Sequence, residues 1–245
     1  MPDTTPPTTL PTFSTLHTYL LTFPAPLAPP PPHPHCLALT SRISSLALHP
    51  ALEAALHILN ADLASAHFLV RHMQGPPAFE GMLLHGILHR VEGDFANARA
   101  WYRDVCGSEV YGVVWPGSNE KGTTNEEHED EANAFLRACE RLANHAADGA
   151  SENGQQEGHG DGDGVGGDVI DRKEGSIRGK TSRRSSREQL EHESRREIER
   201  VVEFCLCRFG DAAWGDATGC WTRPAEDVRK IGEQMVSDGT GWRQF

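Results

Sequence analysis

The sequence predicts an all-α protein whose centre is a pair of stacked helical hairpins. Between residues 50 and 106, apolar residues recur at the three- and four-residue spacing that places them on one face of a helix. Gly75-Pro76-Pro77 and Gly93-Asp94 interrupt this pattern, as expected where short helices end and begin. The second half of the region also resembles the first. These three observations predict short helices joined by tight turns.

Composition divides the chain into packed and unpacked parts. Hydrophobic residues make up 38% of the 245 residues, below the usual range for a globular protein, so we expect part of the chain to lie outside a core. We predict a disordered Pro-rich tail at 1–40 and a helical-hairpin domain at 41–146. A disordered insert at 147–187, rich in Gly, Asp, Ser and Arg, would follow, and C-terminal helices at 188–245 would complete the same domain.

Four apolar stripes define the helices of the two hairpins. They consist of Leu52, Ala55, Leu56 and Leu59; Leu63, Ala66, Val70 and Met73; Phe79, Leu83, Ile87 and Val91; and Phe95, Ala98, Tyr102 and Val105. Further along we expect a loop at 107–123 whose apolar run packs onto the hairpins, and helices at 125–146, 188–208 and 225–236. The last two helices would cover the open end of the stack, because one hairpin cannot bury its own apolar face.

A shift of 32 residues aligns the second hairpin with the first. The identical pairs are Leu56 and Leu88, His57 and His89, Asp62 and Asp94, Ala64 and Ala96, Ala66 and Ala98, and Arg71 and Arg103. A period of this length is typical of helical-hairpin solenoids.

Residues 86–102 resemble a tetratricopeptide-type repeat. Gly86 matches the small residue where the two helices of that repeat cross, and Ala98 and Tyr102 match its packing pair. His85 and His89 depart from the repeat, which usually has Leu and Tyr there. The segment is more similar to a microbial family that carries H-(A/G)-I-L-H-R-x-E-G-D and has no established activity. The resemblance covers about residues 50–106 and implies a fold, without a catalytic residue.

Charge and leader features restrict the class of protein. A formal net charge of −12 argues against binding nucleic acid through phosphate neutralisation. No Lys or Arg precedes Arg42, so the N-terminus lacks the charged region of a signal peptide, and the apolar run at 19–23 is too short for a membrane. Six scattered cysteines suggest reduced thiols. We therefore expect a protein of the cytoplasm or nucleus, with no membrane or nucleic-acid partner.

His85 and His89 are the candidate metal ligands. Residues four apart share a helix face, so both imidazoles could reach one ion, on the side opposite the apolar stripe. Glu92 would be a third ligand or a hydrogen-bond acceptor for one. The segment lacks the glutamate of the H-E-x-x-H peptidases. The alternatives are a polar pair bonded to the adjacent hairpin and two solvent-facing histidines.

Other residues define a candidate binding groove. His57 aligns with His89, so we expect it to line the same groove, which would consist of His57, His85, His89, Glu92, Trp101 and Arg103. Trp101 and Arg103 could form an aromatic and guanidinium patch for a carboxylate or peptide. The alternative is an aromatic core residue flanked by solvated arginines.

We expect binding rather than catalysis, and no cofactor. The first hypothesis is an interaction module for a protein or peptide partner, since hairpin stacks present a concave surface. The alternative is a metal-binding protein or metal-dependent enzyme using His85 and His89. A third possibility is a structural protein regulated by phosphorylation near Ser185 in the basic part of the insert.

Overall fold

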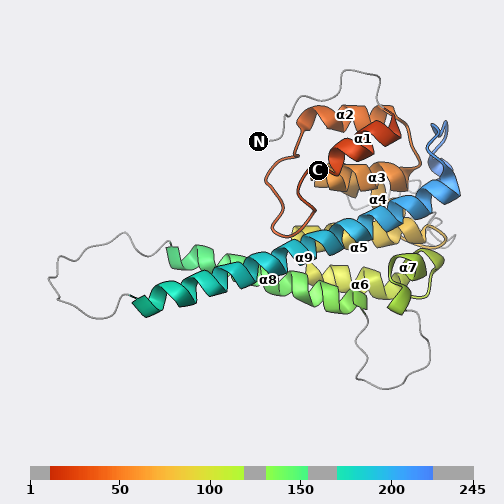
Figure 1. The fold of residues 1–245 in the computed structure, drawn as a ribbon. Helices are drawn as coiled ribbons and strands as arrows, with labels where there is room; N and C mark the ends of the chain where they lie inside the picture. The colour runs from red at the N-terminus through yellow and green to blue at the C-terminus, as the bar shows by residue number, and fades with distance from the viewer. Residues whose placement is uncertain (1–11, 119–130, 154–169, 223–245) are drawn as a thin grey trace, which may run out of the picture.

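Helices make up the regular structure of the computed structural model, which describes residues 12–118, 131–153 and 170–222. These residues contain nine α-helices and no β-strand, which confirms the all-α prediction (Figure 1). The helices are α1 (Phe13–Leu20), α2 (Leu37–Ser45), α3 (Pro50–Leu59), α4 (Leu63–Val70), α5 (Phe79–Glu92), α6 (Phe95–Val105), α7 (Glu109–Val114), α8 (Glu131–Asn153) and α9 (Ile170–Phe209). Within the described ranges, no helix is long and apolar enough to cross a membrane.

Helices α3 and α4 form one hairpin, and α5 and α6 form the other, as predicted; these two pairs pack more extensively than any other. Their inter-helix turns share the same local geometry. Ala61 and Gly93 both adopt the left-handed conformation, with φ of 55° and 88°. Asp62 and Asp94 then cap α4 and α6, each accepting a hydrogen bond from the backbone N–H three residues later.

Gly86 lies where α5 and α6 cross. A Cβ atom at this position would lie 2.8 Å from Cδ2 of Tyr102 and 3.0 Å from Cβ of Trp101, both on α6. These distances are shorter than carbon atoms tolerate, so the absent side chain permits the close approach of the two helices. Tyr102 is 1% exposed and joins the core at this crossing.

The N-terminal segment is folded where the structure describes it, which corrects the prediction of a disordered tail at 1–40. Residues 1–11 lie outside the described residues. Helix α1 buries Phe13, Leu16 and Leu20, and the chain after it buries Phe23 and Leu27 in the same core. The prediction gave weight to the Pro and Thr content, whereas the apolar residues of α1 recur at helical spacing.

Side chains from distant elements bind the backbone of this segment. Asn60 donates from Nδ2 to the carbonyl oxygen of Cys36 at 3.1 Å, and its Oδ1 accepts from the Cys36 N–H at 3.0 Å. Arg195 of α9 donates to the carbonyl oxygens of Leu21 and Phe23. Buried backbone groups outside helices need such partners. The segment therefore packs without continuous secondary structure.

Residues 109–114 form helix α7, where we predicted a loop. Val110, Tyr111 and Val114 are buried, so the apolar run does pack into the core as expected. Ser108 precedes α7 and its side chain accepts from the N–H of Tyr111, which gives the helix a strong start.

The helices around the predicted insert also differ from expectation. Helix α8 begins at Glu131 and continues to Asn153, and α9 begins at Ile170, so helix replaces disorder over part of 147–187. Lys, Arg and Glu have good helix propensity, which a prediction from composition alone underestimates. Residues 154–169 and the helix predicted at 225–236 lie outside the described residues.

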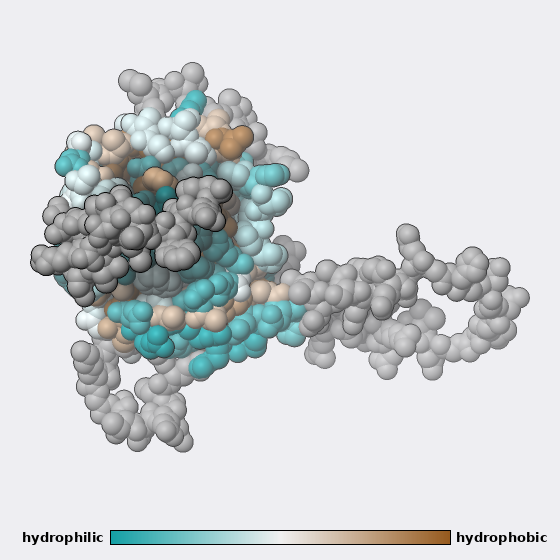
Figure 2. Space-filling model, turned by 180° about the vertical axis from the view of Figure 1, so that it is seen from behind, coloured by the Kyte–Doolittle hydropathy of each residue, from teal (hydrophilic) through white to brown (hydrophobic). Residues whose placement is uncertain are grey.

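Helix α9 joins the two hairpins to the rest of the molecule (Figure 1). It packs against α3, α5, α7 and α8. Its buried apolar residues are Ile198, Val201, Val202 and Cys205, as the sequence predicts. On the face seen in Figure 2, hydrophilic side chains cover most of the described surface and hydrophobic ones form only small patches. The apolar side chains of the hairpins are largely buried among the chain's own elements.

Candidate metal site

Three histidines and a glutamate meet where α4 packs on α5. His67 lies on α4, whereas His85, His89 and Glu92 lie on α5. The rings of His85 and His89 stack with centroids 4.9 Å apart. The ring of His67 lies edge-on to them, with centroid distances of 5.5 Å to His85 and 5.4 Å to His89. The cluster thus spans the two hairpins.

Glu92 brings two of these histidines together. Each of its carboxylate oxygens lies 2.9 Å from Nε2 of His67, and one lies 3.5 Å from Nδ1 of His89. One ligand atom from each of His67, His89 and Glu92 lies within 4.8 Å of the other two. The ligand atoms of a tetrahedral zinc site are about 3.3 Å apart, given bonds of about 2.0–2.1 Å. Small rotations of these side chains would therefore place all three around one ion.

The surroundings of the cluster suit a cation that enters from solvent. The side chain of His67 is 34% exposed and that of Glu92 is 30% exposed. Nδ1 of His85 and Nδ1 of His89 are buried and have no hydrogen-bond partner among the described residues. Buried polar atoms usually have a partner, so these nitrogens need an explanation. A metal bound beside Glu92 would give the nitrogen of His89 a partner.

His85 lies beside this ligand set rather than in it. Its ring stacks on Trp101 at 4.4 Å and on His89 at 4.9 Å, so it is held between an indole and an imidazole. Burial, together with the neighbouring His89 and His67, lowers the pKa of His85 to about 4. His85 is therefore neutral at pH 7. Two stacked imidazoles present their nitrogens side by side, which is why the i, i+4 pair alone does not converge on one point.

The structure separates the other residues of the predicted groove. His57 is fully buried, with Nδ1 3.1 Å from Oδ2 of Asp62 and Nε2 3.5 Å from Oγ of Ser44, so it lines no groove. Arg103 is largely exposed and lies 3.5 Å from Asp104. Residues two apart on a helix do not share a face, so Trp101 and Arg103 form no common patch.

His67 is the residue that sequence reasoning missed. Its spacing from His72, five residues, places the two histidines on different faces of a helix. Its position beside His89 depends on the packing of α4 against α5, which no local pattern encodes. One signal could have identified it. His67 lies on α4, one turn after Leu63, and α4 directly precedes α5, which carries His85 and His89.

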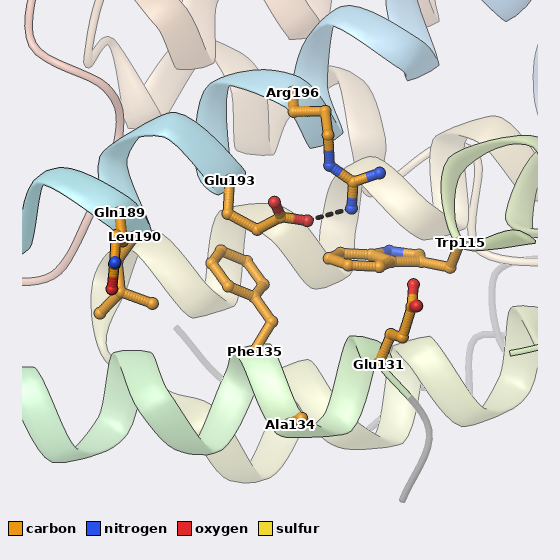
Figure 3. A pocket seen from close by; sticks show the side chains of 8 residues that line it. All are labelled: Trp115, Glu131, Ala134, Phe135, Gln189, Leu190, Glu193 and Arg196. Atoms are coloured by element: carbon orange, nitrogen blue, oxygen red, sulfur yellow. Dashed lines mark hydrogen bonds and ion pairs between the residues drawn. The ribbon is translucent and has the colours of Figure 1, made fainter. Parts of the chain in front are cut away.

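A second feature is a cleft between α8 and α9 (Figure 3). It has a volume of about 570 Å³ and is lined by Trp115, Glu131, Ala134, Phe135, Gln189, Leu190, Glu193 and Arg196. The guanidinium of Arg196 lies 4.9 Å from the centre of the Trp115 ring and pairs with Glu193. In Figure 3 the indole lies between Arg196 and Glu131. The cleft therefore has an aromatic base and charged sides.

Chemically, the histidine cluster can hold a metal and the cleft can hold a side chain. Three protein ligands would leave a coordination position of the metal open for water or another small molecule. Comparison with known proteins found no matching family model, no similar curated protein and no similar solved structure.

Proposed function

We propose that the protein binds a divalent transition metal, Zn²⁺ in the first place, through His67, His89 and Glu92. The observation that carries this proposal is the convergence of the three ligand atoms within 4.8 Å of one another. Two imidazoles and a carboxylate are a ligand set that zinc commonly takes. The set includes His89 and Glu92 from the sequence-based hypothesis, and His67 in place of His85.

A metal would also connect the two hairpins. His67 belongs to the first hairpin and the other two ligands belong to the second, so binding would cross-link α4 and α5. Without a metal, His67 and Glu92 form a partly exposed pair, which contributes only about 0–1 kcal/mol to stability. A bound ion at a hundredfold excess over its Kd would add about 2.7 kcal/mol. Metal-dependent stability therefore separates the proposal from a simple ion pair.

The test is metal content and stability of the full chain, purified without a polyhistidine tag. We expect about one equivalent of zinc after loading and dialysis, and a rise in Tm with zinc. His67→Gln, His89→Gln and Glu92→Gln should each abolish both effects. His72→Gln is the matched control, because His72 follows α4 and its Nδ1 lies 2.7 Å from the carbonyl oxygen of Phe68, outside the cluster. Less than about 0.1 equivalent, or equal loss in the control, rejects the site.

The interaction module is a second candidate, favoured by the cleft between α8 and α9. Trp115, Phe135 and Leu190 offer apolar contacts there, and Glu193 and Arg196 offer polar ones. A peptide with one apolar side chain among polar residues would suit this lining. The repetition of the left-handed turn and the Asp cap after 32 residues supports a duplicated, tetratricopeptide-like hairpin, a class that serves as an interaction scaffold.

Selection of peptides by display on the full chain tests this second candidate. We expect the enriched peptides to lose binding to Leu190→Asp, which places a charge in the cleft. They should keep binding to Phe68→Asp, because Phe68 is an exposed apolar residue of α4, at 55%, that does not line the cleft. Equal binding to wild type and Leu190→Asp would remove the support for this site.

All six cysteines are unpaired, which supports a reducing compartment such as the cytoplasm or nucleus.

A further inference from the structure

A small pocket lies where the beginnings of α5 and α7 meet the end of α9. Its volume is about 210 Å³. Pro77, Phe79, Val110 and Phe204 form apolar walls, and Glu80, Glu109 and Arg208 are its charged residues. The pocket shares no lining residue with the histidine cluster or with the cleft between α8 and α9.

Glu80 is the unusual group in this pocket. It is 6% exposed, and no donor from another described residue lies within hydrogen-bonding distance of its carboxylate; its own backbone N–H is the donor that contacts it. Burial raises the pKa of Glu80, and Arg208 partly opposes this effect. The carboxylate of Glu80 lines the pocket, where a charged carboxylate is costly unless water, a proton or a cation compensates it. Glu80 therefore makes the pocket a site that favours positive charge.

Arg208 does not meet this demand. Its guanidinium lies 3.4 Å from a carboxylate oxygen of Glu109 and 5.9 Å from the centre of the Phe204 ring, and its side chain is half-exposed. Glu109 thus shares the one cation among the described residues of the pocket lining, which leaves Glu80 in excess. The thiols of Cys205 and Cys220 also lie near Glu80. Burial raises the pKa of both thiols, and the negative charge of Glu80 adds to this effect. Both thiols therefore stay neutral at pH 7.

We infer that this pocket binds a small alkylammonium ion, with its charge on the carboxylate of Glu80 and its alkyl chain against Phe79 and Phe204. An ammonium group donates up to three hydrogen bonds, and a carboxylate accepts them. Aromatic walls attract such cations further. The volume is below the range of about 300–1,000 Å³ typical of pockets for drug-sized ligands, so the ligand has only a few heavy atoms.

Other ligand classes fit the pocket less well. An anion would face two carboxylates, with one guanidinium already shared by Glu109. A neutral alcohol would leave the charge of Glu80 uncompensated. A transition metal would need two or three further ligand atoms around Glu80, and no such group of ligands includes this residue within the described chain. An ammonium ion satisfies both the charge and the apolar walls.

Calorimetric titration of the full chain at pH 7.5, in the presence of a metal chelator, tests the inference. The probes are n-butylammonium, n-butanol and butanoate. We expect saturable binding of n-butylammonium and at least about tenfold weaker binding of the other two, because neither can donate a charged hydrogen bond to the carboxylate of Glu80. The chelator makes the result independent of the proposed metal site. Equally tight binding of n-butanol, or no saturable binding of n-butylammonium, overturns the inference.

Two variants and a control assign the binding to this pocket. Glu80→Gln keeps the shape of the side chain and should weaken n-butylammonium binding at least about tenfold. Phe204→Leu keeps an apolar wall without the ring and should weaken it about threefold, which supplies a second readout if the first variant does not fold. The control is Glu203→Gln, which replaces an exposed acid next to Phe204 on α9. This variant should bind n-butylammonium as wild type does. Undiminished binding in both pocket variants contradicts the inference.

Discussion

Arg90 of α5 and Glu197 of α9 form an ion pair with no solvent exposure on either side chain, with Nη2 of the arginine 2.9 Å from a carboxylate oxygen. The arginine also donates to the carbonyl oxygen of Pro26, and the hydroxyl of Tyr102 donates to the glutamate. Burial alone would lower the pKa of Arg90, but Glu197 together with Tyr102 and Cys139 more than offsets this effect, and the net pKa is raised. Arg90 therefore remains charged inside the core.

Glu197→Gln should destabilise the protein by roughly 3–5 kcal/mol, because it leaves the buried guanidinium of Arg90 without a counter-charge. Urea unfolding followed by circular dichroism measures this difference. Arg99→Gln is the control, because Arg99 and Glu140 form a comparable pair with 39% and 34% of their side chains exposed. Its cost should be about 0–1 kcal/mol. A cost for Glu197→Gln no larger than that of the control would contradict the buried pair.

Gly86→Ala should lower stability by about 1–2 kcal/mol. The added Cβ would meet the Tyr102 ring at 2.8 Å, and the cost of overpacking exceeds the gain of about 1 kcal/mol in helix propensity. Thermal and urea unfolding give the value. Gly215→Ala serves as the comparison, since nothing lies within 4 Å of a Cβ there, and it should change stability by less than about 0.5 kcal/mol. A neutral Gly86→Ala would show that α5 and α6 are less closely packed.

Ala61 and Gly93 both have a left-handed backbone in the hairpin turns, so exchanging alanine and glycine at the two positions should change stability in opposite directions. Ala61→Gly should stabilise the protein by up to about 1 kcal/mol, because an alanine at φ 55° is strained. Gly93→Ala should destabilise it by about 1 kcal/mol for the same reason, since the nearest atom to the new Cβ would be 3.8 Å away and no clash contributes. Denaturant unfolding of both variants checks the pair. Changes of the same sign would show that backbone strain does not govern these turns.

His49 predicts a loss of stability in mild acid. Burial lowers its pKa to about 4, and Arg208 contributes to this shift. Its Nδ1 accepts from the Ala51 N–H at the start of α3, and its ring stacks on Phe209 with centroids 3.5 Å apart. Because the folded pKa lies below the unfolded value of about 6.5, this contribution is present above pH 6.5 and is lost as the pH falls towards 4.

His49→Asn tests this effect, since asparagine can cap α3 but does not titrate. We expect the free energy of unfolding to fall less between pH 7 and pH 5 in the variant than in wild type. Other histidines contribute equally to both proteins, so the difference isolates His49. An identical pH dependence in the two proteins would exclude His49 as a source of acid sensitivity.

Trp101 offers an optical report on the proposed metal site. Its indole stacks on His85, which in turn stacks on His89, so a paramagnetic ion at the cluster should quench its fluorescence. We expect saturable quenching by Cu²⁺ in wild type, and a much smaller saturable component in Trp101→Phe and in His67→Gln. Saturable quenching that persists unchanged in His67→Gln would locate the copper elsewhere.

The sequence was informative where structure is set locally. The caps at Asp62 and Asp94 depend on neighbours within a few positions, so the order of the hairpin helices and the turns between them were predicted correctly. The i, i+4 spacing likewise brought His85 and His89 together. Local patterns carry such information because helix geometry fixes which residues share a face.

The errors concern contacts between distant segments. His67 reaches Glu92 only because α4 packs on α5, and that packing angle is not encoded in either helix alone. The Pro-rich segment was predicted to be disordered from its Pro, Thr and Ser content. Its partners, Asn60 and Arg195, come from α3's end and α9. The composition of this segment cannot reveal that it folds, because its backbone carbonyl groups accept hydrogen bonds from side chains far away in the sequence.

The order of synthesis gives the contact between Ser194 and Pro26 a further consequence. The serine hydroxyl donates to the proline carbonyl at 2.7 Å across 168 positions of sequence. A ribosome must therefore synthesise the chain beyond Ser194 before the segment around Pro26 finds this partner. Until then the leucine-rich hairpins lack their cover, and such exposed surfaces attract chaperones or other nascent chains. We expect slow completion of folding, set by the arrival of α9.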